Sequence, residues 1–268
     1  MQIGKETIPK TRISTSNPDT IIVRGRDLAN ELIGKVSFTA YFHLLVTGKP
    51  PSSAATAVLD AALVAIAEHG LVPSVQASRM TLAAAPEAMQ GAVAAGILGC
   101  GSVILGAAES AGEFLEEVRL RTQGQDFTQA AKEVVAEYRR EKRAIPGYGH
   151  PLHKKRDPRV AALFQVAQTT GADMTYVSIA EAIEQVLPDV VGKALMLNVS
   201  AAIPAVLLGV GFPIKALKGV PILARTAGLV GHLTEEKERP IGFALSYQAG
   251  LHAVYEGDAP AGFVPNES

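Results

Sequence analysis

The segment from Arg139 to Arg159 combines strong positive charge with a glycine-bearing loop. Its sequence, RREKRAIPGYGHPLHKKRDPR, has a local excess of six positive charges, although the whole chain has a formal net charge of −1. Backbone N–H groups of such a loop, together with neighbouring cations, bind phosphate groups, so the segment indicates a phosphate-bearing ligand. Charge alone also allows a solvated basic face. RNA fits less well, because few aromatic residues that could stack on bases lie near the segment.

His150 lies within this loop, between Gly149 and Pro151. The flanking glycine lets a ligand approach the backbone closely, and an imidazole can donate a hydrogen bond to an oxygen that gains charge during a reaction. A single loop histidine is also an ordinary surface residue. The residue types alone therefore leave both a catalytic and a structural interpretation of His150 open.

Helices are the elements that must position these residues. Residues 54–69 have apolar side chains at helical spacing and are followed by Gly70 and Pro73, so we expect His69 at a helix end beside a loop. Helical segments are predicted over residues 113–142, with a break near Gly124, and over residues 201–208; Pro158 is predicted to begin another. Only residues 20–23 and 174–178 resemble strands. The fold class is therefore predicted to be all-α.

Length and composition set the remaining limits. A chain of 268 residues with 48% hydrophobic residues can bury a large core as one domain or two unequal ones. The single cysteine, Cys100, cannot form an intramolecular disulfide and is expected to be a small buried residue. The N-terminal sequence MQIGKETIPKTR lacks the apolar core of a secretory signal, so a cytoplasmic location is expected. Residues 88–108 carry no charge but are rich in Gly and Ala, which favours close-packed interior or subunit-interface helices over a membrane span.

Several blocks resemble the citrate synthase superfamily. PGYGHPLHKKRDPR matches the signature in which a P-G-[FY]-G-H loop is followed by D-P-R. TIIVRGRDLANELIGKVSFTAYFHLLVTGKPP, AEHG and LARTAGLVGHLTEEKERP resemble other family blocks in the same order, so the resemblance covers about residues 20–240. The short chain is most similar to the citryl-CoA lyase branch and to the citryl-CoA module of ATP-citrate lyase.

The resemblance implies a citrate synthase-like fold and a CoA-dependent function. We expect a large helical domain of residues 1–104 plus 206–268 and a small CoA-binding domain of residues 105–205. Coenzyme A enters as the thioester substrate or product, with a 2-oxo acid as the other small molecule, and no metal is expected. The resemblance also implies a homodimer or a multiple of dimers whose domains close over substrate. Neither nucleic acid nor membrane is expected as a partner.

The resemblance also assigns roles to individual residues. His69 matches the histidine that binds the oxygen-bearing carbon of the oxaloacetate or citryl group, with Glu68 in place of the usual aspartate before it. His150 matches the loop histidine that handles the carbonyl or hydroxyl oxygen. Arg159 and Arg225 match arginines that hold substrate carboxylates. The residues expected along coenzyme A are Pro146, Gly147, Tyr148, Gly149, Lys154 and Lys155.

Three positions depart from the family pattern. Ser200 stands where an Asn-Val-Asp block has the carboxylate that exchanges a proton with the acetyl methyl group. Ile104 replaces a histidine that stabilises the enolate, and Ile241 replaces a third carboxylate-binding arginine. A serine hydroxyl does not ionise near neutral pH without a neighbouring base, so the change at Ser200 is the most serious.

Two principal hypotheses follow from these departures. In the first, the protein still acts as a CoA-thioester carbon–carbon lyase on citryl-CoA or on a relative with fewer carboxylates such as citramalyl-CoA, with Ser200 relaying a proton through water or leaving protonation to another group. In the second, it binds CoA without turnover as a regulatory homologue; a condensing enzyme with another acceptor is a further alternative. His43 is expected to be a core or interface histidine, and His232 and His252 are too isolated to suggest a metal site.

Overall fold

The structure is a computed structural model that describes residues 9–101, 107–122, 124, 126–149 and 156–263. Its contacts divide the chain into two units. The first contains residues 1–65 and 107–220, and the second contains residues 66–106 and 221–268. Each unit is described below on its own. The expected division into residues 1–104 plus 206–268 and residues 105–205 stays a prediction.

The first unit begins with a small antiparallel sheet. Its strands are β1 (Ser14–Ser16), β2 (Ile21–Val23) and β3 (Arg26–Asp27), with β2 in the centre. A π-helical turn, η1 (Leu28–Leu32), leads to α1 (Phe38–Thr47) and α2 (Ser53–Ala67). Ser37 begins α1 because its hydroxyl accepts from the amide of Ala40, and Gly48 ends it in the left-handed conformation.

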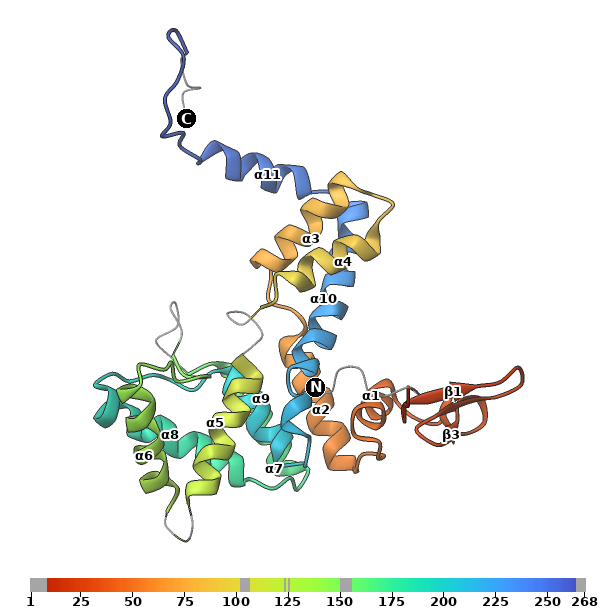
Figure 1. The fold of residues 1–268 in the computed structure, drawn as a ribbon, viewed down its shortest axis with the longest axis vertical. Coiled ribbons are helices and arrows are strands. Elements are labelled where there is room, and N and C mark those ends of the chain that lie inside the picture. The colour runs from red at the N-terminus through yellow and green to blue at the C-terminus, as the bar shows by residue number, and fades with distance from the viewer. Residues whose placement is uncertain (1–8, 102–106, 123, 125, 150–155, 264–268) are drawn as a thin grey trace. The chain divides into compact units, whose positions relative to one another are not determined.

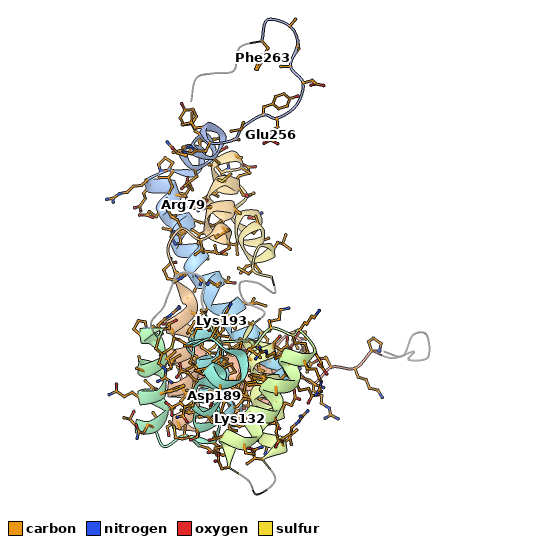
Figure 2. All side chains as sticks on the ribbon, turned by 90° about the vertical axis from the view of Figure 1, so that its left-hand side faces the viewer. Arg79, Lys132, Asp189, Lys193, Glu256 and Phe263 are labelled. Atoms are coloured by element: carbon orange, nitrogen blue, oxygen red, sulfur yellow. The ribbon has the colours of Figure 1, made fainter. Side chains whose placement is uncertain are left out.

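The remaining helices of this unit form its main core. They are α5 (Ala107–Arg121), α6 (Phe127–Arg140), α7 (Pro158–Thr169), α8 (Thr175–Val191) and α9 (Val199–Leu208), followed by the 3₁₀ turn η2 (Ile214–Ala216). Helices α6 and α8 pack side by side, and Lys132 of α6 lies 3.9 Å from Asp189 of α8 (Figures 1 and 2).

Helix α9 is the central helix of this core. It packs against α5, α7 and α8, and within it only Ser200 and Leu208 are not fully buried. A helix that is apolar on all sides is stable only where other helices surround it. The position of the polar Ser200 at the N-terminal end of α9 is therefore fixed by the burial of the seven residues that follow it, 201–207.

The second unit contains α3 (Pro73–Ala84), α4 (Met89–Leu98), most of α10 (Gly219–Glu238) and α11 (Gly242–Leu251). Helices α3 and α4 pack closely, and α11 packs against α3. A Cβ added to Gly96 of α4 would lie 2.7 Å from Leu229 of α10 and 2.9 Å from the Ser74 carbonyl oxygen of α3. The small residues thus allow close helix contacts, as expected. Beyond α11, the segment that carries Glu256 and Phe263 extends away from these helices (Figure 2).

The predicted fold class is confirmed, because the described residues are mainly helical apart from the small sheet. The predicted breaks near Gly124 and Gly70 and the helix start at Pro158 are also confirmed. The strand expected at residues 174–178 is wrong: these residues form the start of α8, and Asp173 accepts hydrogen bonds from the amide and hydroxyl of Thr175, its first residue. No helix among the described residues is long and apolar enough to cross a membrane.

Candidate functional site

In the first unit, the glycine loop is joined to the segment that precedes α9. The amide of Gly149 donates to the Met196 carbonyl oxygen at 2.8 Å, and the amide of Asn198 donates to the Gly147 carbonyl oxygen at 3.0 Å. The side-chain amide of Asn198 donates to the carbonyl oxygen of Gly149 at 2.9 Å. These bonds hold the loop of residues 146–149 in an extended pairing beside the start of α9.

Gly147 allows the loop to lie directly against α9. Its φ of +84° is a left-handed conformation, and a Cβ at this position would lie 2.3 Å from the Cβ of Ala201 and 2.8 Å from its backbone nitrogen. Any other residue would meet both the strained φ and this contact. The structure therefore brings the predicted CoA-binding loop and Ser200 together at the N-terminal end of α9.

The Tyr148 side chain anchors this loop in the core. It is buried, its hydroxyl donates to the Ala180 carbonyl oxygen at 2.8 Å, and its ring lies edge-on to Phe114. Burial, reinforced by the nearby carboxylate of Glu184, raises the pKa of Tyr148 well above its ordinary value. The Tyr148 side chain thus holds the loop against the core. Because this side chain is buried, the proposed contact of Tyr148 with CoA would be made by its backbone.

Glu184 of α8 is a further residue that holds the loop, and no motif or spacing in the sequence indicates this role. One of its carboxylate oxygens accepts from the amide of Leu197 at 2.6 Å, and the other lies 2.9 Å from Nη2 of Arg156. Leu197 forms an isolated antiparallel β-bridge with Tyr148 of the glycine loop. Glu184 therefore ties the basic segment to the backbone that supports the glycine loop.

Asp157 and Arg159 form a compact pair at the start of α7. Asp157 begins the helix by accepting from the amide of Arg159, and it also accepts from the guanidinium nitrogens Nε at 3.0 Å and Nη2 at 2.7 Å. Nη1 of Arg159 donates to the Ala65 carbonyl oxygen at 3.3 Å. Burial opposes ionisation of Asp157, but the bonds from Arg159 and from the amide of Val199 outweigh it and lower the pKa of Asp157. Arg159, Ser200 and the glycine loop thus surround the same end of α9.

The Asp157→Asn variant tests this pair. The asparagine can still accept at the helix start but loses the ion pair, so we expect the free energy of unfolding to fall by about 1–2 kcal/mol at pH 7. Because the folded-state pKa of Asp157 is lower than its ordinary 3.8, its contribution is complete above that pH and is lost as the pH falls through the folded-state pKa. Urea unfolding between pH 7 and pH 3 should show the wild-type advantage shrinking only below about pH 4. A constant difference across this range would contradict the assignment.

The positive segment is less uniformly exposed than its charge count indicates. Arg156 pairs with Glu184 and Glu181, and the guanidinium of Arg143 lies 3.6 Å from the centre of the Tyr138 ring. Arg140 and Lys142 are exposed at the end of α6. Acidic residues of α8, distant in sequence, therefore neutralise part of the predicted cluster. The remaining candidates of this segment, His150, Lys154 and Lys155, lie outside the described residues, as does Ile104.

In the second unit, His69 lies in an exposed turn that follows α2. Glu68 shapes this turn, because its Oε1 accepts from the amides of His69, at 2.8 Å, and Gly70. Its Oε2 lies 2.9 Å from Nε2 of His232 on α10. Burial opposes ionisation of Glu68, but the hydrogen bond from His232 and those from the backbone outweigh it and lower the pKa of Glu68. The predicted position of His69 beside a loop at a helix end is confirmed.

A buried ion pair lies next to His232. Arg79 of α3, labelled in Figure 2, is 2% exposed. Its Nε lies 2.6 Å from Oε2 of Glu236, which is 3% exposed. Nη1 of Arg79 bonds Glu235 at 2.8 Å and approaches Nδ1 of His232 at 3.4 Å. Glu236 also accepts from the amides of Ile241 and Gly242. Sequence reasoning did not identify this network, which connects α3, α10 and the start of α11.

Arg225 is buried in α10, in the second unit. His43 is buried in α1, where its Nδ1 lies 3.1 Å from the Lys49 carbonyl oxygen and its ring lies near Phe212, so the expectation of a core histidine is confirmed. Cys100 is buried, as expected, and its thiol donates to the Gly96 carbonyl oxygen. Among the described residues, no group of three or more His, Cys, Asp or Glu side chains is arranged to hold a metal ion.

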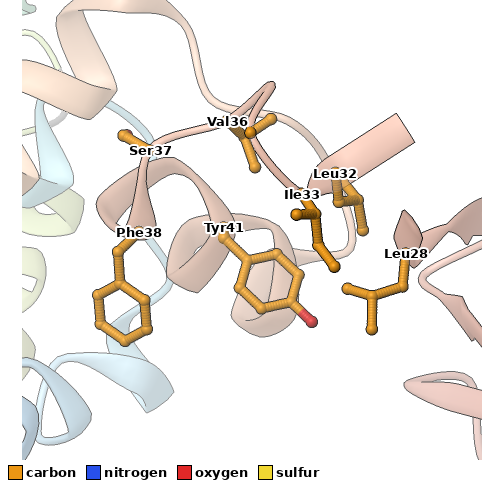
Figure 3. A pocket seen from close by; sticks show the side chains of 8 residues that line it. Leu28, Leu32, Ile33, Val36, Ser37, Phe38 and Tyr41 are labelled. Atoms are coloured by element: carbon orange, nitrogen blue, oxygen red, sulfur yellow. The ribbon is translucent and has the colours of Figure 1, made fainter. Parts of the chain in front are cut away.

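An apolar cavity of about 220 Å³ lies between η1 and α1 (Figure 3). Its lining contains no residue that is charged at neutral pH; it consists of Leu28, Leu32, Ile33, Gly34, Val36, Ser37, Phe38 and Tyr41. Cationic side chains, which bind phosphate groups, are absent from this lining. The cavity is therefore chemically unlike the expected CoA-binding residues.

Comparison with protein families and curated sequences identifies relatives of one kind. Residues 35–242 match the family model described as "Citrate synthase, C-terminal domain". The chain is 29% identical over 211 residues to a citrate synthase of Heyndrickxia coagulans and 30% identical over 207 residues to the citrate/2-methylcitrate synthase of Bacillus subtilis. These alignments cover 76% and 75% of this chain but 53% of each relative. The chain thus spans about half the length of the curated relatives it matches.

Solved structures include one of matching length. The citryl-CoA lyase of Hydrogenobacter thermophilus has a TM-score of 0.83 and 31% sequence identity, with 96% of this chain and 98% of that chain covered. An ATP citrate lyase of Methanosaeta concilii, a D541A mutant in complex with (3S)-citryl-CoA, has a TM-score of 0.77 and 23% identity, with 96% of this chain and 43% of that chain covered. The second likeness concerns the fold alone.

Proposed function

We propose that this chain, which belongs to the citrate synthase family, is a carbon–carbon lyase of the citryl-CoA lyase type. The proposed reaction cleaves citryl-CoA, or a related 3-hydroxyacyl-CoA such as citramalyl-CoA, to acetyl-CoA and a 2-oxo acid. One observation supports this choice above the others: the likeness to a citryl-CoA lyase extends over nearly the full length of both chains. The relatives named as citrate synthases are about twice as long as the matched region.

The proposed chemistry begins at the hydroxyl of the substrate. His150 or His69 takes the hydroxyl proton, the adjacent carbon–carbon bond breaks, and its electron pair passes to the thioester as an enolate. Protonation of the enolate carbon then gives acetyl-CoA, and the former hydroxyl carbon becomes the carbonyl of the 2-oxo acid. Arg159 and Arg225 hold substrate carboxylates, and the loop of residues 146–149 with Lys154 and Lys155 binds CoA. The pairing of this loop with the start of α9 supports its role as a rigid binding surface.

Ser200 favours one alternative. A serine at the position of a proton-transferring carboxylate is compatible with a homologue that binds CoA and has lost turnover. The synthase names of the sequence relatives favour another alternative, a condensing enzyme with a different acceptor. These alternatives share the CoA-binding residues and differ in the products formed.

One experiment distinguishes the lyase, the condensing enzyme and the inactive homologue. Purified protein is incubated with citryl-CoA, with (3S)-citramalyl-CoA, and with acetyl-CoA plus the 2-oxo acid product of each. Mass spectrometry of the CoA species over time identifies the reaction. Lyase function predicts conversion of one hydroxyacyl-CoA to acetyl-CoA. Condensation without cleavage would support the synthase alternative, and CoA binding without conversion of any thioester would support the inactive homologue.

The Ser200→Asp variant is expected to raise the rate of citryl-CoA cleavage about 100-fold, at the lower end of what positioned acids and bases contribute. An aspartate also suits this position, because Ser200 lies in the first turn of α9 where negative charge is stabilised. Initial rates of acetyl-CoA release at pH 7 check the expectation. An unchanged rate would mean that the enolate receives its proton from another group.

The proposal includes a homodimer and a cytoplasmic location. A homodimer is supported by three exposed apolar side chains at four-residue spacing on α11, Phe243, Tyr247 and Leu251, which cover one face of that helix. Light scattering of the purified chain measures this directly. A cytoplasmic location is part of the proposal because it fits the supply of CoA thioesters.

A further inference from the structure

The geometry points to His232 and Glu68 as positioning residues that fix the His69 turn for catalysis. The inference rests on the proposed function only in that His69 acts on the substrate. Its basis is a continuous series of contacts from a buried ion pair to the backbone of that turn. All of these residues belong to the second unit.

The ring of His232 has a defined orientation between two groups of opposite chemistry. Nδ1 faces Nη1 of Arg79, which can only donate, at 3.4 Å. Nε2 faces Oε2 of Glu68, which can only accept when ionised, at 2.9 Å. The tautomer that suits both neighbours carries its proton on Nε2, so that Nδ1 accepts from Arg79 and the Nε2–H lies within ion-pair distance of the Glu68 carboxylate.

Arg79 cannot shift away from this arrangement, because its other nitrogens are bonded to fixed partners. Nε bonds Glu236, and Nη2 donates to the Arg239 carbonyl oxygen at 3.1 Å. Arg79 and Glu236 are both almost fully buried. His232 therefore has a rigid support on its Nδ1 side, and this rigidity passes to the carboxylate on its Nε2 side.

Glu68 transmits the arrangement to the backbone. While Oε2 is held by His232, Oε1 accepts from the amides of His69 and Gly70, which fixes the turn that presents the His69 ring. Close packing restricts the same turn: a Cβ on Gly228 would lie 2.2 Å from the Ala67 carbonyl oxygen and 3.2 Å from Oε2 of Glu68. Gly228 lies one helical turn before His232. One face of α10 therefore sets the position of residues 67–70.

The test compares four variants by steady-state kinetics with citryl-CoA. His232→Leu removes the donor and should lower kcat roughly 10- to 100-fold with little change in KM, because a small displacement of a reacting group has effects of this size. His232→Gln keeps an N–H donor near Nε2 and should recover most of the loss. Glu68→Gln, at a half-exposed position, should also lower kcat. Thr234→Ala, an exposed position on α10 that bonds only its own helix, is the matched control and should behave as wild type.

A double variant tests whether the two residues act together. If His232 works through Glu68, His232→Leu with Glu68→Gln should be no slower than the worse single variant. Multiplying losses in kcat would contradict the inference, and so would a wild-type kcat in His232→Leu. Equal losses of kcat in His232→Gln and His232→Leu would also contradict the inference, because the N–H donor at this position would then have no effect.

An NMR measurement keeps the inference testable if no thioester is turned over. The amide protons of His69 and Gly70 bond a carboxylate, so their resonances should move toward those of unbonded amides in His232→Leu but not in His232→Gln or Thr234→Ala. A shift without any turnover by the wild type would overturn the proposed function and leave the positioning of the turn intact. Unchanged resonances in His232→Leu would overturn the positioning itself.

Discussion

Replacing Arg79 with methionine is expected to lower the free energy of unfolding by about 3–5 kcal/mol. The reason is the carboxylate of Glu236, which is 3% exposed and would lose the guanidinium that lies 2.6 Å from it. A charge left in a buried position without its partner costs far more than the pair contributes over an apolar replacement. Urea unfolding followed by circular dichroism measures the change.

Two controls separate this effect from the general loss of an arginine. Arg121→Met removes a guanidinium whose ion pairs with Glu117 and Glu137 are partly exposed, and it should cost less than about 1 kcal/mol. Adding Glu236→Gln to Arg79→Met removes the stranded charge and should recover at least about 1 kcal/mol. A double variant that is less stable than Arg79→Met would show that the buried charge is not the source of the loss.

The Gly147→Ala variant is expected to lower the free energy of unfolding by about 2–5 kcal/mol and to abolish CoA-thioester turnover. About 1–2 kcal/mol comes from the positive φ and the rest from overlap with the backbone of Ala201. The loop cannot relieve the overlap without breaking its bonds to Met196 and Asn198. Thermal unfolding and the acetyl-CoA assay measure the two consequences separately.

Gly171→Ala is the matched control for this variant. Gly171 has a φ of +73°, close to that of Gly147, but a Cβ there would have no atom within 4 Å. It should therefore show only the conformational cost, about 1 kcal/mol, and retain turnover. Equal losses of stability in the two variants would contradict the close approach of the glycine loop to α9.

Local signals explain which elements could be predicted from the sequence. Pro158 with Asp157 before it begins α7, and Gly70, with its positive φ, lies in the turn that follows α2, because such residues act on the nearby backbone. Residues 174–178, which include Thr175, Tyr176 and Val177, have the composition of a strand but form the start of α8. The helix is stabilised by the hydrogen bond from the Thr175 amide to Asp173 and by the burial of Val177, Ile179 and Ala180. This burial is a tertiary effect that overrides the local preference for a strand.

The supporting residues of the candidate site could not be predicted in the same way. Arg79 and Glu236 are 157 positions apart, and nothing near either residue indicates the other. His232 looked isolated in the sequence because its partner, Glu68, lies on another helix end. Glu184 likewise supports the glycine loop from α8. The motif residues themselves were identifiable, whereas the contacts that orient them depend on how distant helices pack.

The central claim is that this chain breaks a carbon–carbon bond and leaves the thioester intact. A single-turnover experiment with enzyme in excess over (3S)-citryl-CoA, quenched and analysed by mass spectrometry, tests it most directly. The claim predicts that acetyl-CoA and oxaloacetate appear together in equal amounts as citryl-CoA disappears. Formation of citrate and unacylated CoA would contradict it, and so would the absence of acetyl-CoA both from citryl-CoA and from (3S)-citramalyl-CoA supplied in its place.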